Sequence, residues 1–81
     1  MVRAHIRLNS TKECQDFIAK MNSDGTAEKY VLCNDTNCYR ADARSMLGAL
    51  YAMTEFNDKM YLVNETVDGK FPQFIDQYRV L

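Results

Sequence analysis

The sequence predicts an α+β domain in which three helices cover one face of a four-stranded antiparallel sheet, in the order βαββαβα. Three observations support this: an N-terminal segment of alternating apolar residues, two longer segments with apolar residues at helical spacing, and turn formers between the segments. Each connection that contains a helix can cross over the same face of the sheet. We therefore expect a two-layer, open-faced sandwich that forms one domain over residues 1–81.

The first strand and the first helix have the clearest patterns. Apolar and polar side chains alternate over residues 2–8, as in a strand with one buried face. Ser10 and Glu13 have the spacing of a capping box, in which each side chain satisfies a backbone N–H of the first turn. The helix is expected to end near Asn22, and its buried face recurs at i, i+3, i+4 and i+7: Cys14, Phe17, Ile18 and Met21.

The middle of the chain predicts a hairpin followed by a short helix. Residues 27–42 have the composition of two strands around a turn at 34–37. Four side chains are expected on one face of this hairpin: Tyr30, Leu32, Tyr39 and Ala41. Small and unbranched residues then favour a helix over residues 46–53, with Ser45 as its N-cap.

The last third of the chain predicts one strand and one helix. A turn at residues 57–58 precedes a fourth strand over residues 59–64. A C-terminal helix is expected to follow, with Pro72 in its first turn, where its missing N–H is tolerated. Its apolar face again has helical spacing: Phe71, Phe74, Ile75 and Tyr78.

Composition and charge exclude several classes of function. Ten Lys and Arg against eleven Asp and Glu give a net charge of −1, so no net field attracts nucleic acid or an anionic membrane. No segment approaches the roughly 20 apolar residues of a membrane span. The alternating N-terminal segment also lacks the continuous apolar core of a secretory signal. We therefore expect a cytoplasmic protein without nucleic-acid or membrane partners.

The three cysteines, Cys14, Cys33 and Cys38, are expected to be free thiols, because an odd number without an export signal does not indicate a disulfide framework. A hairpin that closes on residues 34–37 would place Cys33 directly opposite Cys38, so a cross-strand disulfide is the alternative. Three scattered thiols and His5 lack the paired ligand spacing of a zinc site. We expect neither a metal nor a cofactor.

A basic row lies on the polar side of the first strand and consists of Arg3, His5 and Arg7, with Arg40 as a possible neighbour on the open face. Such a row is ordinarily a solvated sheet face. Single-stranded RNA is the competing ligand, but it needs aromatic side chains beside the charges, and residues 2–8 contain none. We therefore interpret the row as a solvated face.

A short segment resembles a known family. Residues 43–48 read Ala-Arg-Ser-Met-Leu-Gly, which is similar to the regulatory-serine segment of the HPr phosphocarriers of the bacterial sugar phosphotransferase system, typically Lys-Ser-Ile/Leu-Met/Leu-Gly. The expected strands and helices also fall at HPr-like positions over nearly the whole chain. The resemblance implies the HPr-like sandwich and a bacterial, cytoplasmic protein related to sugar transport and its regulation.

The departure from the family is equally specific. In HPr the turn into the first helix reads Gly-Ile/Leu-His-Ala/Thr-Arg-Pro-Ala, and its histidine accepts the phosphoryl group. Residues 9–15 read Asn-Ser-Thr-Lys-Glu-Cys-Gln here, so Thr11 takes the place of the histidine. A hydroxyl does not form the labile phosphoramidate that reversible transfer requires, and Glu13 repels an incoming phosphate. We expect no catalytic residue, since His5, the only histidine, lies inside a strand.

Two features of the second helix are the candidate functional residues. Ser45 is either a plain helix cap or, as the resemblance implies, the serine phosphorylated by an HPr-kinase-like enzyme. Apolar residues on a short helix are usually core, but the resemblance places Met46, Leu47 and Leu50 in a patch that docks protein partners. Tyr51, Tyr61 and the aromatic residues near the C-terminus are expected to be packing residues.

The favoured hypothesis is a regulatory, protein-binding module of the HPr family that transfers no phosphate and is not an enzyme. Its expected partners are an HPr-kinase-like enzyme, a transcriptional regulator or components of the phosphotransferase system. Two alternatives remain open. One is an active phosphocarrier with an atypical acceptor such as His5, and the other is a structural module that forms a homodimer through the apolar patch.

Overall fold

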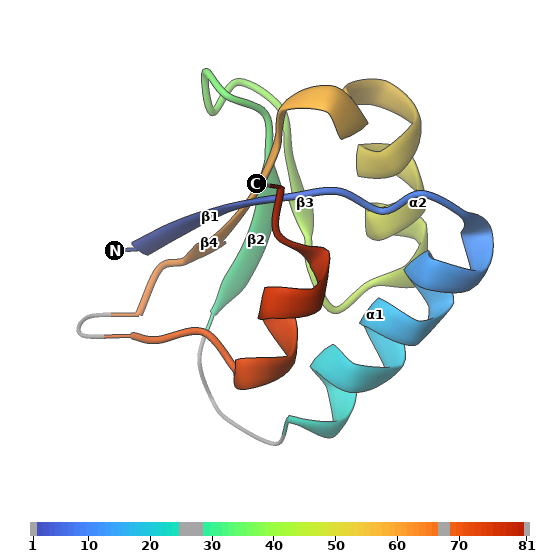
Figure 1. Cartoon of the computed structure of the whole chain (residues 1–81). Coiled ribbons are helices and arrows are strands. Elements are labelled where there is room, and N and C mark those ends of the chain that lie inside the picture. Colours follow the sequence, from blue (N-terminus) through green and yellow to red (C-terminus); the bar gives the residue numbers. More distant parts are fainter. Residues whose placement is uncertain (1, 25–28, 67–68, 81) are drawn as a thin grey trace.

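The chain forms one antiparallel sheet with its helices packed on one side (Figure 1). The structure is a computed structural model, and it describes residues 2–24, 29–66 and 69–80. The elements follow in this order: β1 (Val2–Ile6), α1 (Thr11–Ser23), β2 (Tyr30–Cys33), β3 (Arg40–Asp42), α2 (Met46–Phe56), the 3-10 helix η1 (Asn57–Lys59), β4 (Met60–Asn64) and the 3-10 helix η2 (Gln73–Tyr78). The predicted α+β class with an open antiparallel sheet is confirmed.

The strand order across the sheet is β1-β4-β2-β3, so the last strand lies between the first and the second. Both neighbours of β4 run antiparallel to it, and its residue Leu62 pairs with Ala4 on one side and Leu32 on the other. β3 forms one edge of the sheet and pairs only with β2. β4 and β2 are therefore the central strands, and they carry apolar runs over residues 60–63 and 30–33.

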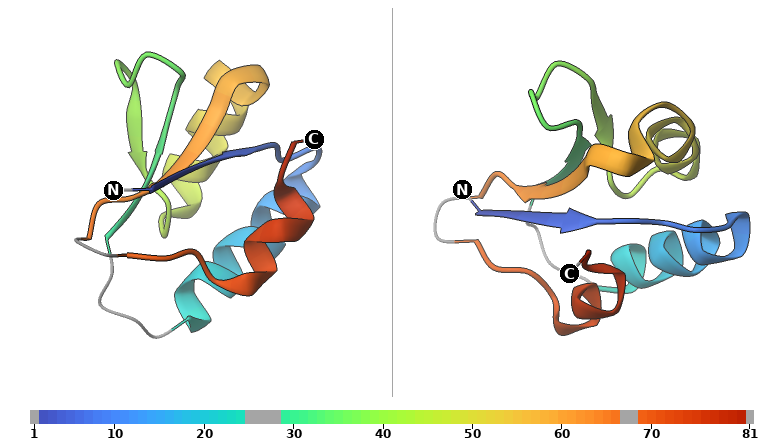
Figure 2. Two further views of the ribbon diagram at one scale, coloured as in Figure 1. Left: turned by 60° about the vertical axis from the view of Figure 1, so that its left-hand side comes forward. Right: turned by 45° about the horizontal axis from the view of Figure 1, so that its top comes forward.

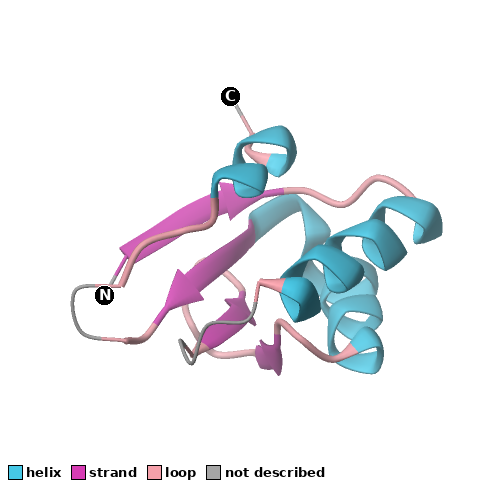
Figure 3. Ribbon diagram, turned by 90° about the horizontal axis from the view of Figure 1, so that it is seen from below, coloured by secondary structure: helices cyan, strands magenta, loops and turns pink. Residues whose placement is uncertain are grey.

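The core lies between the sheet and the two α-helices, which lie side by side in Figures 2 and 3. All four residues of the apolar face predicted for the first helix are buried. The alternation predicted for the first strand is confirmed from Ala4 onward, with Ala4 and Ile6 buried beneath the helices, whereas Val2 is exposed. The side chains that are fully buried include Phe17, Ile6, Leu8, Met21, Leu32, Met60 and Leu62. Helical periodicity and strand alternation therefore identified the inward faces of these elements correctly.

The C-terminal helix differs from the prediction. It is a six-residue 3-10 helix preceded by Pro72, whereas an α-helix was expected. Its inner face is the predicted one, since Ile75 and Tyr78 are buried. The helix ends where the chain returns to the sheet: the Val80 N–H donates to the His5 carbonyl at 2.9 Å. Pairing with β1 requires an extended backbone, which limits the helix to a short turn.

The hairpin also differs from the prediction. Cys33 pairs with Arg40 instead of Cys38. The Asn34 side chain explains the shift, because its Oδ1 accepts hydrogen bonds from the backbone N–H groups of Cys38 and Tyr39 at 2.8 and 3.2 Å. Cys33 is buried, Cys38 is exposed, and both are free thiols, as is Cys14. The alternative of a disulfide between Cys33 and Cys38 is therefore not supported.

We expect the three thiols to react with iodoacetamide at very different rates. Burial raises the pKa of the Cys14 and Cys33 thiols, and both side chains are almost inaccessible, so their reactive thiolate is scarce. Cys38 is exposed and should be alkylated first. Mass spectrometry of the native protein should find one adduct, on Cys38, and three after denaturation. Early alkylation of Cys33 would contradict its buried position.

Within the residues that the structure describes, no helix is both long enough and apolar enough to cross a membrane.

Candidate functional site

The second helix begins at a serine whose side chain closes the first turn. Ser45 has an extended backbone (φ −100°, ψ 127°), and its Oγ accepts a hydrogen bond from the Gly48 N–H at 3.2 Å. Its carbonyl oxygen accepts one from the Ala49 N–H at 2.8 Å. Ser45 is half-buried, so its hydroxyl is partly accessible at the positive end of the helix dipole. The predicted N-cap is confirmed.

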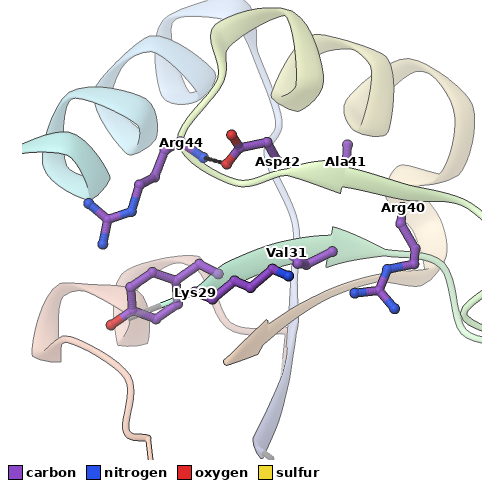
Figure 4. A pocket seen from close by; sticks show the side chains of 7 residues that line it. Lys29, Val31, Arg40, Ala41, Asp42 and Arg44 are labelled. Carbon is purple, nitrogen blue, oxygen red and sulfur yellow. Dashed lines mark hydrogen bonds between the residues drawn. The ribbon is translucent and has the colours of Figure 1, made fainter. Parts of the chain in front are cut away.

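The turn before Ser45 is fixed by Asp42 and Arg44, which Figure 4 shows joined by a hydrogen bond. The Asp42 carbonyl accepts from the Ser45 N–H at 3.2 Å, and the Asp42 Oδ1 accepts from the Arg44 N–H at 2.9 Å. The Arg44 guanidinium donates to the Met21 carbonyl at 3.1 Å and lies 5.3 Å from the centre of the Tyr30 ring. The cap is thereby tied to the end of α1 and to β2.

The three residues of the expected docking patch differ in exposure. Leu47 is 80% exposed, whereas Met46 and Leu50 are half-buried and pack against the core. The fully buried positions of the helix include the small residues Ala49 and Ala52. α2 therefore buries alanines while it leaves a leucine in solvent, the reverse of the usual distribution on a packed helix.

Aromatic residues extend the exposed apolar surface beyond Leu47. Tyr51, one turn further along α2, is 42% exposed, and Tyr39, just before β3, is 56% exposed. The Tyr51 ring lies edge-on to the Phe56 ring with centroids 5.9 Å apart, and the Tyr39 ring stacks on Phe56 at 6.5 Å. We call the exposed residues Leu47, Tyr51 and Tyr39, together with the buried Phe56 ring that contacts both tyrosines, the α2 surface.

The sequence contained part of the signal for the α2 surface. Leu47 and Tyr51 are four residues apart and so share a helix face, while the alanines mark another face as closely packed. Tyr39 could not be placed in this way, because only the packing of the β2–β3 hairpin against α2 brings it next to Phe56. The interpretation of Tyr51 as a packing residue missed its large exposed fraction.

The start of α1 carries hydroxyl, amine and carboxylate side chains, but no histidine. Ser10 caps the helix, and its Oγ accepts from the Glu13 N–H at 3.1 Å. Thr11 is the first helical residue and is exposed. The segment before it is fixed by Asn57, whose side chain accepts from the Leu8 N–H at 3.1 Å and donates to the Leu8 carbonyl at 2.8 Å. The helix start therefore presents the side chains of Ser10, Thr11, Lys12 and Glu13, and none of them is an imidazole.

His5 lies on β1 and faces the open side of the sheet. The His5 ring stacks on the Tyr61 ring of β4 with centroids 4.8 Å apart. The Arg3 guanidinium lies 4.1 Å from the centre of the Tyr61 ring. The basic row thus has an aromatic neighbour that sequence analysis missed, because the pairing of His5 with Tyr61 joins residues far apart in the chain. Arg3 and His5 themselves contact the ring, and so limit its availability to a nucleobase.

A hollow of about 540 Å³ lies beside β2 and the edge strand β3 (Figure 4). Three cations line it, Lys29, Arg40 and Arg44. Arg40 forms a close ion pair with Glu65, whose other oxygen lies 3.9 Å from the Lys29 amine, and Arg44 lies 3.9 Å from Asp24. Because each cation has a carboxylate beside it, the hollow has little surplus charge to attract an anion.

Within the described ranges, no three His, Cys, Asp or Glu side chains lie close enough together to hold a metal ion. The residues that remain as candidates are Ser45 and the α2 surface. Comparison of the chain with protein-family models, curated proteins and solved structures found no match.

Proposed function

We propose that this chain is an HPr-like regulatory module that binds a protein partner through α2 and does not transfer phosphate. The observation that carries the proposal is the exposed Leu47 side chain, which stands two residues after the half-buried cap Ser45. The Ser45 hydroxyl is partly accessible and lies close in sequence to the exposed Leu47 side chain. Phosphorylation of Ser45 would therefore change the charge beside a docking contact without changing the fold.

The architecture supports the family resemblance at the level of element order. Strand, helix, two strands, helix, strand and a short final helix follow one another as expected, and the helices cover one face of the sheet. The short 3-10 helix η2 in place of a third α-helix leaves the same residues, Ile75 and Tyr78, in the core. The glycine of the motif also has a structural role, since a Cβ at Gly48 would lie 2.8 Å from the Asp42 carbonyl oxygen.

The phosphocarrier alternative has little support from the side chains. Thr11 and Glu13 stand at the start of α1, and neither provides the nitrogen nucleophile that reversible phosphoryl transfer needs. The His5 side chain lies on β1 and stacks on the Tyr61 ring. Its Nε2 lies 3.4 Å from the backbone carbonyl oxygen of Asp58. A phosphoryl group on that nitrogen would displace the contact and face a carbonyl oxygen.

Ser45 is the proposed modification site. A phosphate on its Oγ would lie at the N-terminus of α2, where the free N–H groups and the helix dipole stabilise negative charge. The Asp42 carboxylate, in the turn before Ser45, already accepts a hydrogen bond from the Arg44 N–H, so it does not compete with the phosphate for the free N–H groups of α2. We therefore expect phosphorylation to leave α2 folded while it adds nearly two negative charges beside Leu47.

The test is incubation with an HPr kinase and ATP, followed by intact-mass measurement. We expect one phosphate on the wild type and none on Ser45→Ala. Ser10→Ala is the matched control, because Ser10 is the other serine that caps a helix, and it should gain one phosphate. Loss of either cap costs about 1 kcal/mol, so circular dichroism should find all three proteins folded. An unmodified wild type would remove Ser45 from the proposal.

A second incubation, with enzyme I and phosphoenolpyruvate, separates the proposal from the phosphocarrier alternative. We expect no acid-labile phosphate on the chain. If such a phosphate appears and is lost in His5→Gln, the chain is a phosphocarrier with an atypical acceptor, and the proposed function is wrong.

A further inference from the structure

The α2 surface continues into a hollow of about 420 Å³ between the β2–β3 hairpin and the last turn of α2. Tyr39 and Phe56, both part of the α2 surface, line this hollow. So do three carboxylate side chains, Asp35, Glu55 and Asp58. The aromatic surface and the acidic hollow are therefore one continuous region, in which Tyr39 and Phe56 belong to both.

Charge around the hollow is unbalanced. Of the described residues, Lys59 is the only cation that lines it, and its amine lies 3.8 Å from the Asp35 carboxylate. Among the residues that the structure describes, Glu55 and Asp58 have no ion-pair partner, and both are exposed. This contrasts with the hollow beside β3, where each cation has a carboxylate within 4 Å.

The end of α2 adds to the negative potential. Its last turn contains no basic residue, although lysine or arginine stabilises this end of a helix dipole, and it contains Glu55. An acidic side chain at a helix C-terminus costs stability, and no contact within the described chain offsets that cost. A cation supplied from outside would do so, and the exposed ring of Tyr39 offers it a cation-π contact.

We propose that the partner of the α2 surface is a basic, amphipathic protein segment. An apolar side chain of that segment packs on Leu47 and Tyr51, and a lysine or arginine enters the hollow beside Tyr39, Glu55 and Asp58. The inference rests on the proposed function for the docking site and adds the chemistry of the partner, because the aromatic contact and the charge complementarity both favour a cation. It also predicts that phosphorylation of Ser45 strengthens this docking.

The test uses two short synthetic peptides, one alternating leucine with lysine and the other alternating leucine with glutamate. Each is titrated into the full ¹⁵N-labelled chain at low salt, and amide resonances are followed. We expect the lysine peptide to shift residues of the α2 surface and the hollow, and to bind about tenfold or more tightly than the glutamate peptide. The preference should fall as salt is raised, because screening weakens exposed charge pairs.

Charge-reversal variants separate specific docking from general attraction to an acidic protein. Combining Glu55→Lys with Asp58→Lys should weaken the lysine peptide about tenfold and remove the preference for it. Folding should be retained, since lysine suits the end of a helix. Asp16→Lys, at an exposed position on α1, is the matched control for a single reversal of the same sign, and it should change affinity less than about threefold.

The outcomes distinguish this inference from the proposed function. Equal binding of both peptides at the α2 surface overturns the basic partner and leaves docking through α2 in place. Shifts confined to the open sheet face, or an effect of Asp16→Lys as large as that of the combined Glu55→Lys and Asp58→Lys variant, also overturn it. Absence of any binding overturns the inference, while the incubations with the kinase and with enzyme I test the proposed function independently.

Discussion

Replacing Asn64 with alanine is expected to lower the free energy of unfolding by about 2–3 kcal/mol. Asn64 is the one polar residue in the described chain that is completely buried. Its Nδ2 donates to the Lys70 carbonyl at 2.8 Å, and its Oδ1 accepts from the Thr66 N–H at 2.9 Å. Alanine leaves both backbone groups without these partners and leaves a cavity at the end of β4. Urea unfolding of the variant and the wild type measures the difference.

The side-chain amide of Asn64 also explains why residue 69 is a glycine. A Cβ at Gly69 would lie 2.4 Å from the Asn64 Cγ, so only glycine allows the backbone to approach the amide so closely. The control for Asn64→Ala is Asn9→Ala, an exposed asparagine whose loss should change the free energy of unfolding by less than about 0.5 kcal/mol. Equal stabilities of the two variants would contradict the structural role of Asn64.

Replacing Gly48 with alanine is expected to destabilise the protein by about 1–2 kcal/mol. Helix propensity alone predicts the opposite, because alanine is favoured over glycine by about 1 kcal/mol inside a helix. A Cβ at position 48, however, would lie 2.8 Å from the Asp42 carbonyl oxygen and 3.3 Å from the Asp42 backbone nitrogen. Both are backbone atoms of the turn that holds Ser45, so relief of the clash must move the cap. Thermal unfolding and urea titration both report the sign.

Thr54→Ala is the matched control for Gly48→Ala. It lies on the same helix, is exposed, and gains helix propensity without meeting another backbone, so it should stabilise the protein by a few tenths of a kcal/mol. If Gly48→Ala stabilised the protein as well, the close approach of α2 to Asp42 would be wrong. The result also bears on function, because the glycine sets the position of the Ser45 hydroxyl.

Sequence patterns located the elements whose signals are local. The apolar face of α1, the alternation in β1 and the caps Ser10 and Ser45 depend on residues within one or two turns of each other, and each was confirmed. The same local logic identified Ile75 and Tyr78 as core residues, although it gave the wrong helix type for η2. That error arose because the length of η2 is limited by pairing with β1, a contact that no local window contains.

The candidate site was only partly predictable for the same reason. Ser45 and Leu47 were found from a short motif, and the structure leaves both at least partly accessible. Tyr39 and the acidic hollow escaped notice because they arise where the hairpin meets the end of α2. Tyr61 escaped for a related reason, since its contact with His5 is made across β1 and β4.

By itself, the sequence determined which residues cap the two α-helices and which faces of α1 and β1 point inward. The tertiary structure alone decided the strand order, the register of the β2–β3 hairpin, which places Cys33 opposite Arg40, and which large apolar side chains remain in solvent. The division has a physical cause. Periodicity reports the burial that one element needs, whereas the final exposure of a side chain depends on which distant element packs against it.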